Sequence, residues 1–195
     1  LGDGKLLSQL TKKIVINNFR ENDIKNGGEG APLTPIFHNL ISRQITLKNQ
    51  IKFPINIINI GGISNITSII QDQDNLDDNI FARDIGPGNC MIDEWIRKNS
   101  KKNFDIDGNI ANSGNIDKLI INQAKDNFAI KSYEKSLDIN DFDISFLKGL
   151  SLEDGSATLT DFTAYLISKG IEYTIEKIKN TNGTFLICGG GRKNK

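Results

Sequence analysis

The stretch that most constrains the fold runs from residue 55 to residue 93. It opens with an apolar, β-branched run, Ile55 to Ile60, that stops abruptly at Gly61 and Gly62. Such a run is typical of a buried strand, and the two glycines let a ligand approach the backbone closely where the strand ends. Residues 66–70 are expected to pair antiparallel with the first strand, because only the glycine turn separates the two segments.

A second glycine turn follows later in the same stretch. Residues 80–85 read as a short strand that leads into Gly86-Pro87-Gly88-Asn89, with Asp84 just before the turn. The chain then continues as a helix, for which Asn89 is a suitable N-cap. Asp93 falls in the first turn of this helix, where it would either favour the helix dipole or reach a ligand or metal ion.

A third glycine turn lies near the end of the sequence. Phe185 to Cys188 read as a buried strand, and Gly189, Gly190 and Gly191 end it. A long helix with one apolar stripe precedes this strand over residues 156–179. Strands therefore alternate with helices, and in such α/β folds ligands bind at the strand ends.

Each of these turns also has a plain structural explanation. A Gly-Gly pair after a strand is usually a hairpin turn, and an aspartate before Gly-Pro-Gly is usually a turn former. The combination of three glycine turns with a carboxylate beside a helix N-terminus is what indicates phosphate chemistry.

Shorter patterns predict the remaining elements. They indicate a short helix at residues 6–10 capped by Asp3, a brief strand at 14–16, helices at 37–41 and 116–128, and a polar loop at 132–142. Residues 104–108 resemble the start of a calcium loop, but the later ligand positions of an EF-hand do not follow.

Composition excludes several classes of function. The 195 residues carry no net charge, which gives no electrostatic reason to bind nucleic acid or an anionic membrane. No apolar run is long enough to span a bilayer and no signal peptide is visible, so we expect a cytoplasmic protein. Cys90 and Cys188 are expected to be reduced core residues. Neither has a metal-ligand neighbour and His38 is the only histidine, so a zinc site is not expected.

A polar segment near the start of the chain is a further candidate for ligand binding. Phe19-Arg20-x-x-Asp23 precedes the sequence Gly-Gly-Glu-Gly-Ala-Pro-Leu at residues 27–33. Arg20 and Asp23 are expected to flank a turn, either as a solvated surface pair or hydrogen-bonded to a polar ligand across the glycine loop.

Taken together, these motifs resemble those of the anhydro-N-acetylmuramic acid kinase family, within the actin, sugar kinase and Hsp70-like ATPase superfamily. The motifs that carry the resemblance are residues 19–23 and 27–33, Asn-Ile-Gly-Gly-x-x-Asn at 59–65, Asp-x-Gly-Pro-Gly-Asn at 84–89, Asp-x-Trp at 93–95, Asp-x-Asp-Gly at 105–108, Ala-Thr-Leu-Thr at 157–160 and Cys-Gly-Gly-Gly at 188–191. The resemblance covers nearly the whole chain.

The resemblance implies an α/β fold, namely a ribonuclease-H-like lobe of an actin-type ATPase with a mixed central sheet and flanking helices. It also implies an ATP-dependent kinase that opens the 1,6-anhydro ring of anhydro-N-acetylmuramate with water and phosphorylates O6. The product, N-acetylmuramate 6-phosphate, is an intermediate of cell-wall recycling. ATP and Mg²⁺ are the implied cofactors, because phosphoryl transfer needs its charge neutralised.

The same resemblance implies roles for individual residues. Asp84 would be the general base that activates the water. The residues that would contact the sugar are Arg20, Asp23, Glu29 and Asn89. The residues that would bind ATP are Gly61, Gly62 and Asn65 in a phosphate loop, and Gly189, Gly190 and Gly191 on the adenosine side. The resemblance assigns no residue to the metal.

Several features of the family are absent from this sequence. It has no Gly-Thr-Ser-x-Asp-Gly first phosphate loop and no His-Gly-Gln-Thr segment, and Glu29 stands where the family has glutamine. A Pro-Lys-Ser-Thr-Gly-Arg-Glu segment survives only as Lys135-Ser136. The chain also begins with Leu1 rather than methionine. We therefore expect residues 1–18 to be the end of a first lobe, and residues 19–195 to be a second lobe without its C-terminal part.

Three interpretations of function follow. The chain is one part of a sugar kinase that binds ATP and an amino sugar, together with a separately encoded first lobe or a second copy. Alternatively, it is an inactive remnant of such a kinase with weak ligand binding. The third interpretation is an ATPase-type module that regulates a partner.

Overall fold

The computed structural model describes residues 3–28, 30–31, 33–49, 51–73, 78–127, 136–179 and 182–194. The chain divides into two compact units, Leu1–Leu33 and Thr34–Lys195.

The N-terminal unit consists of two short helices. α1 (Gly4–Thr11) begins after Asp3, whose carboxylate accepts two backbone N–H groups of the first turn at 2.9 and 3.0 Å, as the sequence predicts. α2 spans Phe19–Lys25. The prediction of a strand at residues 14–16 is wrong, because these residues have no regular secondary structure. Three successive apolar or β-branched residues do not make a strand without a neighbouring strand to pair with.

The larger unit is built on a four-stranded mixed sheet with the strand order β3-β2-β1-β4. β1 (Ile55–Ile60) and β2 (Ile63–Ile69) form an antiparallel hairpin around the first glycine turn. β3 (Ile80–Pro87) pairs antiparallel with β2, and β4 (Thr184–Cys188) pairs parallel with β1. The structure thus confirms the four predicted strands and the mixed sheet.

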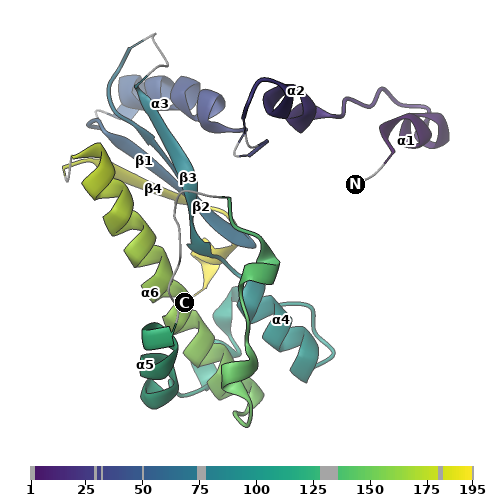
Figure 1. Ribbon diagram of the computed structural model, residues 1–195, viewed down its shortest axis with the longest axis vertical. Helices are drawn as coiled ribbons and strands as arrows, with labels where there is room; N and C mark the ends of the chain where they lie inside the picture. Colours follow the sequence, from purple (N-terminus) through teal and green to yellow (C-terminus); the bar gives the residue numbers. More distant parts are fainter. Residues whose placement is uncertain are drawn as a thin grey trace. The chain divides into compact units, whose positions relative to one another are not determined.

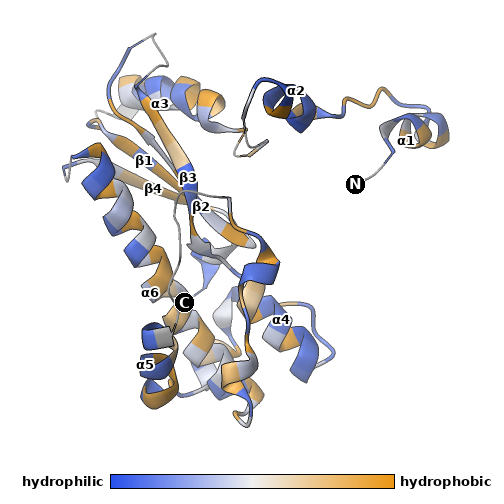
Figure 2. Ribbon diagram, viewed as in Figure 1, coloured by the Kyte–Doolittle hydropathy of each residue, from blue (hydrophilic) through white to orange (hydrophobic). Residues whose placement is uncertain are grey.

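Helices cover both faces of this sheet (Figure 1). α3 (Pro35–Asn49) packs on β2 and β3 from one side, and it is longer than its sequence pattern predicts. α6 (Leu152–Ile178) crosses β3 on the other side, where its Ile167 packs against isoleucines of β1, β2 and β3. Figure 2 shows hydrophobic and hydrophilic residues alternating along α6, which confirms the amphipathic helix predicted for this segment.

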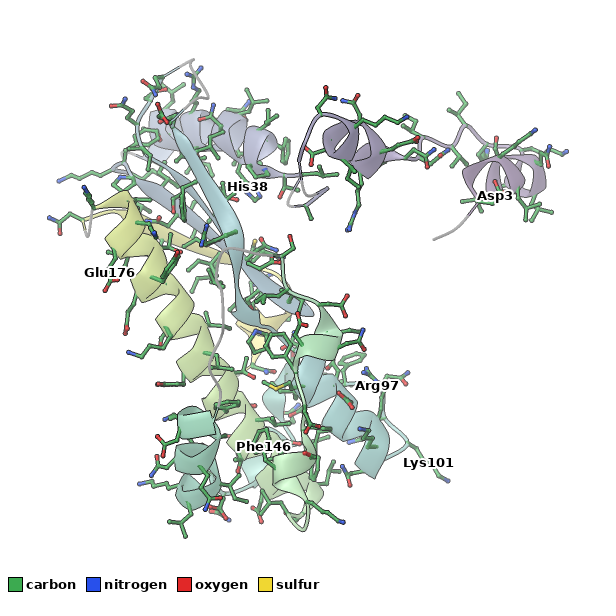
Figure 3. All side chains as sticks on the ribbon, viewed as in Figure 1. Asp3, His38, Arg97, Lys101, Phe146 and Glu176 are labelled. Carbon is green, nitrogen blue, oxygen red and sulfur yellow. The ribbon has the colours of Figure 1, made fainter. Side chains whose placement is uncertain are left out.

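A second core forms where α6 passes α4 (Cys90–Asn99) and α5 (Lys118–Asn127). The indole Nε1 of Trp95 donates to the carbonyl oxygen of Leu152 at 3.0 Å, which joins α4 to the start of α6. Phe146, labelled in Figure 3, packs edge-to-face against Phe162, with the centroids of the two rings 5.5 Å apart. The short helices that complete this unit are η1 (Ile106–Gly108), η2 (Ala111–Ser113), η3 (Ile139–Asp141), η4 (Ser145–Leu147) and η5 (Gly190–Lys193).

β4 is not the buried strand that its apolar sequence predicts. It lies at the edge of the described sheet, and Phe185 and Ile187 are 39% and 56% exposed. Cys188 is exposed as well, so its predicted place in the core is wrong, whereas Cys90 is partly buried. An apolar run predicts a strand, but it does not distinguish a central strand from an edge strand.

No helix in the part of the chain that the structure describes combines the length and the hydrophobicity that crossing a bilayer requires.

His38 of α3 is expected to make the stability depend on pH. Its Nδ1 lies 2.9 Å from Oγ1 of Thr67 in β2, and burial lowers the pKa of the imidazole below its ordinary value of 6.5 (Figure 3). Because the pKa of the folded state is the lower one, the stability that His38 contributes is complete above about pH 6.5 and decreases as the pH falls through the folded-state pKa.

The measurement is the free energy of urea unfolding of the wild type and of His38→Gln. We expect the wild-type value minus the variant value to decrease between about pH 7.5 and about pH 5. His38 is the only histidine, so no second imidazole contributes to this difference. A difference that stays constant over this range would contradict the prediction.

Candidate functional site

The first two glycine turns are hydrogen-bonded to each other. The carbonyl oxygen of Gly62 accepts the backbone N–H of Gly88 at 2.8 Å and that of Cys90 at 3.1 Å. The carbonyl oxygen of Gly61 accepts the N–H of Asn89 at 2.7 Å. The turn between β1 and β2 is thereby fixed against the N-terminus of α4, although the two turns are far apart in sequence.

The third glycine turn joins them at the end of β1. A Cβ atom at Gly189 would lie 2.4 Å from the carbonyl oxygen of Ile60, and one at Gly191 would lie 2.2 Å from Cγ2 of the same residue. Gly189 also has a φ of +87°, which favours glycine. The turn passes so close to β1 that a side chain at either position would displace it.

Asn89 lies between these turns and does not cap α4. Its backbone is in the right-handed helical region and its side chain makes no capping hydrogen bond, so the predicted N-cap is wrong. Instead its amide lies beside the third turn, since a Cβ at Gly191 would be 3.2 Å from Oδ1 and a Cβ at Gly190 would be 3.8 Å from Nδ2. A capping asparagine needs an extended backbone, which this position does not have.

A row of polar side chains crosses the sheet next to these turns. Asn59 in β1, Asn65 in β2 and Asp84 in β3 are successive cross-strand partners, so they lie on one face of the sheet, the face that α3 covers. Cys188 in β4 continues the row, and its thiol donates to Oδ1 of Asn59 at 3.8 Å. Asn59 is the first residue of the motif at 59–65 but was given no role in the predicted site, and its pairing with Asn65 places it in this row.

Asp84 is held by a segment from a distant part of the chain. Its Oδ2 accepts the backbone N–H of Leu137 at 2.9 Å, and the residue is partly buried. The β2–β3 register shifts between Ser64 and Asn65, so a bulge lies where the row reaches β3. Bulges of this kind re-aim side chains, and here the aspartate stands near the end of its strand, beside the glycine turns.

The thiol of Cys90 is not a nucleophile at this site. Burial is the main cause that raises its pKa to about 11. The thiol therefore stays protonated near neutral pH, and only a thiolate attacks.

A pocket of about 440 Å³ opens beside the third glycine turn, a size typical of small-molecule sites. The first turn of α4, the loop before η1 and the η5 turn contribute its walls. The residues that line it are Asn89, Ile92, Asp93, Phe104, Asp105, Ile106, Asp107, Gly190, Lys193 and Asn194. Asp105 has a structural role, because its two carboxylate oxygens accept the backbone N–H groups of Ile110 and Ala111.

The described residues contain no cluster of three or more His, Cys, Asp or Glu side chains that could hold a metal ion.

Two of the residues predicted to bind the sugar, Arg20 and Asp23, belong to the N-terminal unit. Arg20 and Asp23 lie on α2 and do not flank a turn, so that part of the prediction is wrong. The sequence Phe-Arg-Glu-Asn-Asp-Ile-Lys has no residue that interrupts a helix. Oδ2 of Asp23 accepts the N–H of Gly30 at 2.7 Å and so holds the glycine loop against the helix. Glu29 lies outside the described residues.

Comparison with known proteins gives one consistent family. The sequence model of the family "Anhydro-N-acetylmuramic acid kinase" matches residues 1–195. Proteins of that name from Pelagibacter ubique, Zymomonas mobilis and Agrobacterium fabrum are 51%, 37% and 38% identical to this chain, and each match covers 100% of it. The matches cover 50%, 50% and 49% of these relatives, so the chain spans about half of their length.

Proposed function

This chain belongs to the anhydro-N-acetylmuramic acid kinase family, and from that membership we propose that it is one part of an ATP-dependent sugar kinase. Its fold class is accordingly that of the actin-type ATPases, with a mixed sheet between helices. The observation that carries the proposal is the meeting of three glycine turns around Asn89, next to the carboxylate of Asp84.

The proposed reaction acts on 1,6-anhydro-N-acetylmuramate. Water attacks the anomeric carbon and the bond from C1 to O6 breaks, while O6 takes the γ-phosphoryl group of ATP. The products are N-acetylmuramate 6-phosphate and ADP. The water loses a proton in this step, so the site needs a positioned general base.

We assign the role of general base to Asp84. A partly buried carboxylate, fixed by the N–H of Leu137 and placed in a row with two amide side chains, has the restricted orientation that a base needs. Arg20, Asp23, Glu29 and Asn89 are proposed to contact the sugar. For Asn89 the support is its place between the glycine turns.

We place the nucleotide along the glycine turns. Gly62 is exposed, and a Cβ atom there would meet no other atom within 4 Å, so a phosphate group can approach this backbone. Gly61, Asn65 and Gly189 to Gly191 complete the proposed ATP site, with Mg²⁺ bound to the phosphates. The pocket beside Gly190 would then hold the nucleoside, because its walls combine apolar and polar groups.

The role of this chain within a larger enzyme is also a proposal. We assign residues 19–195 to a second lobe and residues 1–18 to the end of a first lobe, in the cytoplasm. A separately encoded first lobe or a second copy of the chain would supply the remaining groups. Because phosphoryl transfer depends on several positioned groups acting together, full activity is expected only when both lobes are present.

The test is the release of ADP from ATP and Mg²⁺, with and without 1,6-anhydro-N-acetylmuramate. The chain is assayed alone, and then mixed with the part of the Pelagibacter ubique relative that the chain does not cover. We expect sugar-dependent release of ADP in the mixture and at least about a hundredfold less from the chain alone, since one lobe lacks part of the site.

The alternatives give different results. Release of ADP without any dependence on the sugar would favour an ATPase-type module. If both parts are folded and neither they nor their mixture release ADP, the chain is an inactive remnant. Equal activity of the chain alone would contradict the two-lobe proposal.

A further inference from the structure

Two polar side chains at the start of α4 line the pocket beside the third glycine turn. The first of them, Asn89, lies between the three glycine turns. Asp93 is one helical turn further along α4, and its N–H donates to the carbonyl oxygen of Asn89 at 2.8 Å. Residues four apart on a helix lie about 5–6 Å apart on the same side, so the two side chains line the pocket in succession.

The carboxylate of Asp93 has no strong partner from the protein. It makes no hydrogen bond within the described part of the chain, and burial raises its pKa above the ordinary value of 3.8. Arg97, one turn further along α4 and labelled in Figure 3, lowers the pKa of Asp93 through its positive charge, but less than burial raises it. A half-buried carboxylate lining a pocket is best stabilised by a ligand that donates hydrogen bonds to it.

Apolar side chains also line the pocket, alongside polar ones. Phe104 and Ile106 line it while remaining 54% and 60% exposed, and Ile92 lines it from α4. Exposed apolar groups at a pocket are suited to the faces of a flat aromatic ring. One pocket therefore brings together a glycine turn, a carboxylate that can accept hydrogen bonds, and apolar side chains.

We infer that Asp93 recognises the ribose of the nucleotide by accepting hydrogen bonds from its 2′- and 3′-hydroxyl groups. This inference rests on the nucleotide site proposed above. The ribose of a nucleotide carries the hydroxyl groups that an acceptor can bind, and Asp93 is one helical turn from Asn89, which lies between the glycine turns. The carboxylate accepts and cannot donate, so it selects for hydroxyl groups over hydrogen at these positions.

The test is a thermodynamic cycle that measures binding by titration calorimetry. ADP, 2′-deoxy-ADP and 3′-deoxy-ADP are titrated into the 195-residue chain and into its Asp93→Ala variant. We expect the wild type to bind ADP about tenfold or more tightly than at least one deoxy analogue, because a charge-assisted hydrogen bond is lost. In Asp93→Ala that ratio is expected to fall to about one, which a merely structural role of Asp93 would not produce.

Glu94→Gln is the matched control. Glu94 is the next residue of the same helix, but it does not line the pocket, and its carboxylate pairs with Lys98 at the surface. This variant removes the same charge and is expected to keep the wild-type preference for ribose. A loss of preference in Glu94→Gln equal to that in Asp93→Ala would assign the effect to net charge and overturn the inference.

The other outcomes are also distinct. If the wild type binds ADP and both deoxy analogues equally well, the role of Asp93 is wrong while the nucleotide site stands. The same holds if the ribose preference persists in Asp93→Ala. If the wild type binds none of the three nucleotides at about millimolar concentration, the nucleotide site itself is wrong, and the role of Asp93 is wrong with it.

Discussion

Asp84→Asn is expected to lower the sugar-dependent release of ADP by about 10²- to 10⁴-fold, the usual contribution of a general base. The asparagine side chain keeps an oxygen that can accept the N–H of Leu137, so the local structure is expected to remain. What the variant loses is the ability to take a proton from water. The measurement is the ADP-release assay on the mixture of this chain with the complementary part of the Pelagibacter ubique relative.

Two comparisons make this result specific. The affinity of Asp84→Asn for ADP is expected to match that of the wild type, because Asp84 is assigned to the sugar side of the reaction. Asp138→Asn is the control variant: Asp138 is exposed, close to Leu137 in sequence and outside the polar row. It is expected to keep normal turnover. Turnover of Asp84→Asn at the wild-type rate would remove Asp84 from the mechanism.

Gly88→Ala is expected to lower the free energy of unfolding by about 1–3 kcal/mol, the usual consequence of overpacking. The added Cβ would lie 2.1 Å from the carbonyl oxygen of Gly61, which is backbone and cannot rotate away. The turn must therefore move, and the hydrogen bonds from Gly88 and Asn89 to the first glycine turn are lost or lengthened. Urea unfolding measures the change, and weaker binding of ADP is expected to accompany it.

Gly62→Ala is the matched control for this prediction. It makes the same chemical change in the partner turn, but the added Cβ would meet no atom within 4 Å. Its free energy of unfolding is expected to stay within about 0.5 kcal/mol of the wild type, as for other surface substitutions. If both variants lose the same stability, close contact between the turns is not the cause.

The sequence predicted the framework of the fold well, because its signals are local. The apolar run of β1, the antiparallel β2 after Gly61-Gly62 and the amphipathic stripe of α6 each specify an element through neighbouring residues. The errors concern tertiary surroundings. The sequence of residues 185–188 does not indicate that β4 is an edge strand. The sequence of residues 14–16 does not indicate that they lack a strand to pair with.

In the candidate site, too, the local motifs were predicted and the contacts between them were not. The glycine turns and Asp84 were predicted as separate motifs, and the structure brings them together. The contacts of Asn89 with Gly191 and of Asp84 with Leu137 join residues more than fifty positions apart, so no local pattern contains them. Asn59 belongs to the motif at 59–65 but was given no role, because a single asparagine in an apolar strand has no distinctive spacing. Only its strand pairing with Asn65 and Cys188 reveals its position.

The parallel pairing of β1 with β4 has a consequence for the order in which the molecule folds. The β1–β2–β3 meander needs only short loops and can form early, whereas Cys188 meets Asn59 across 129 residues. Closing so long a loop is slow, so β4 is expected to dock last. During synthesis on the ribosome, the third glycine turn can reach the other two only after almost all of this chain has emerged.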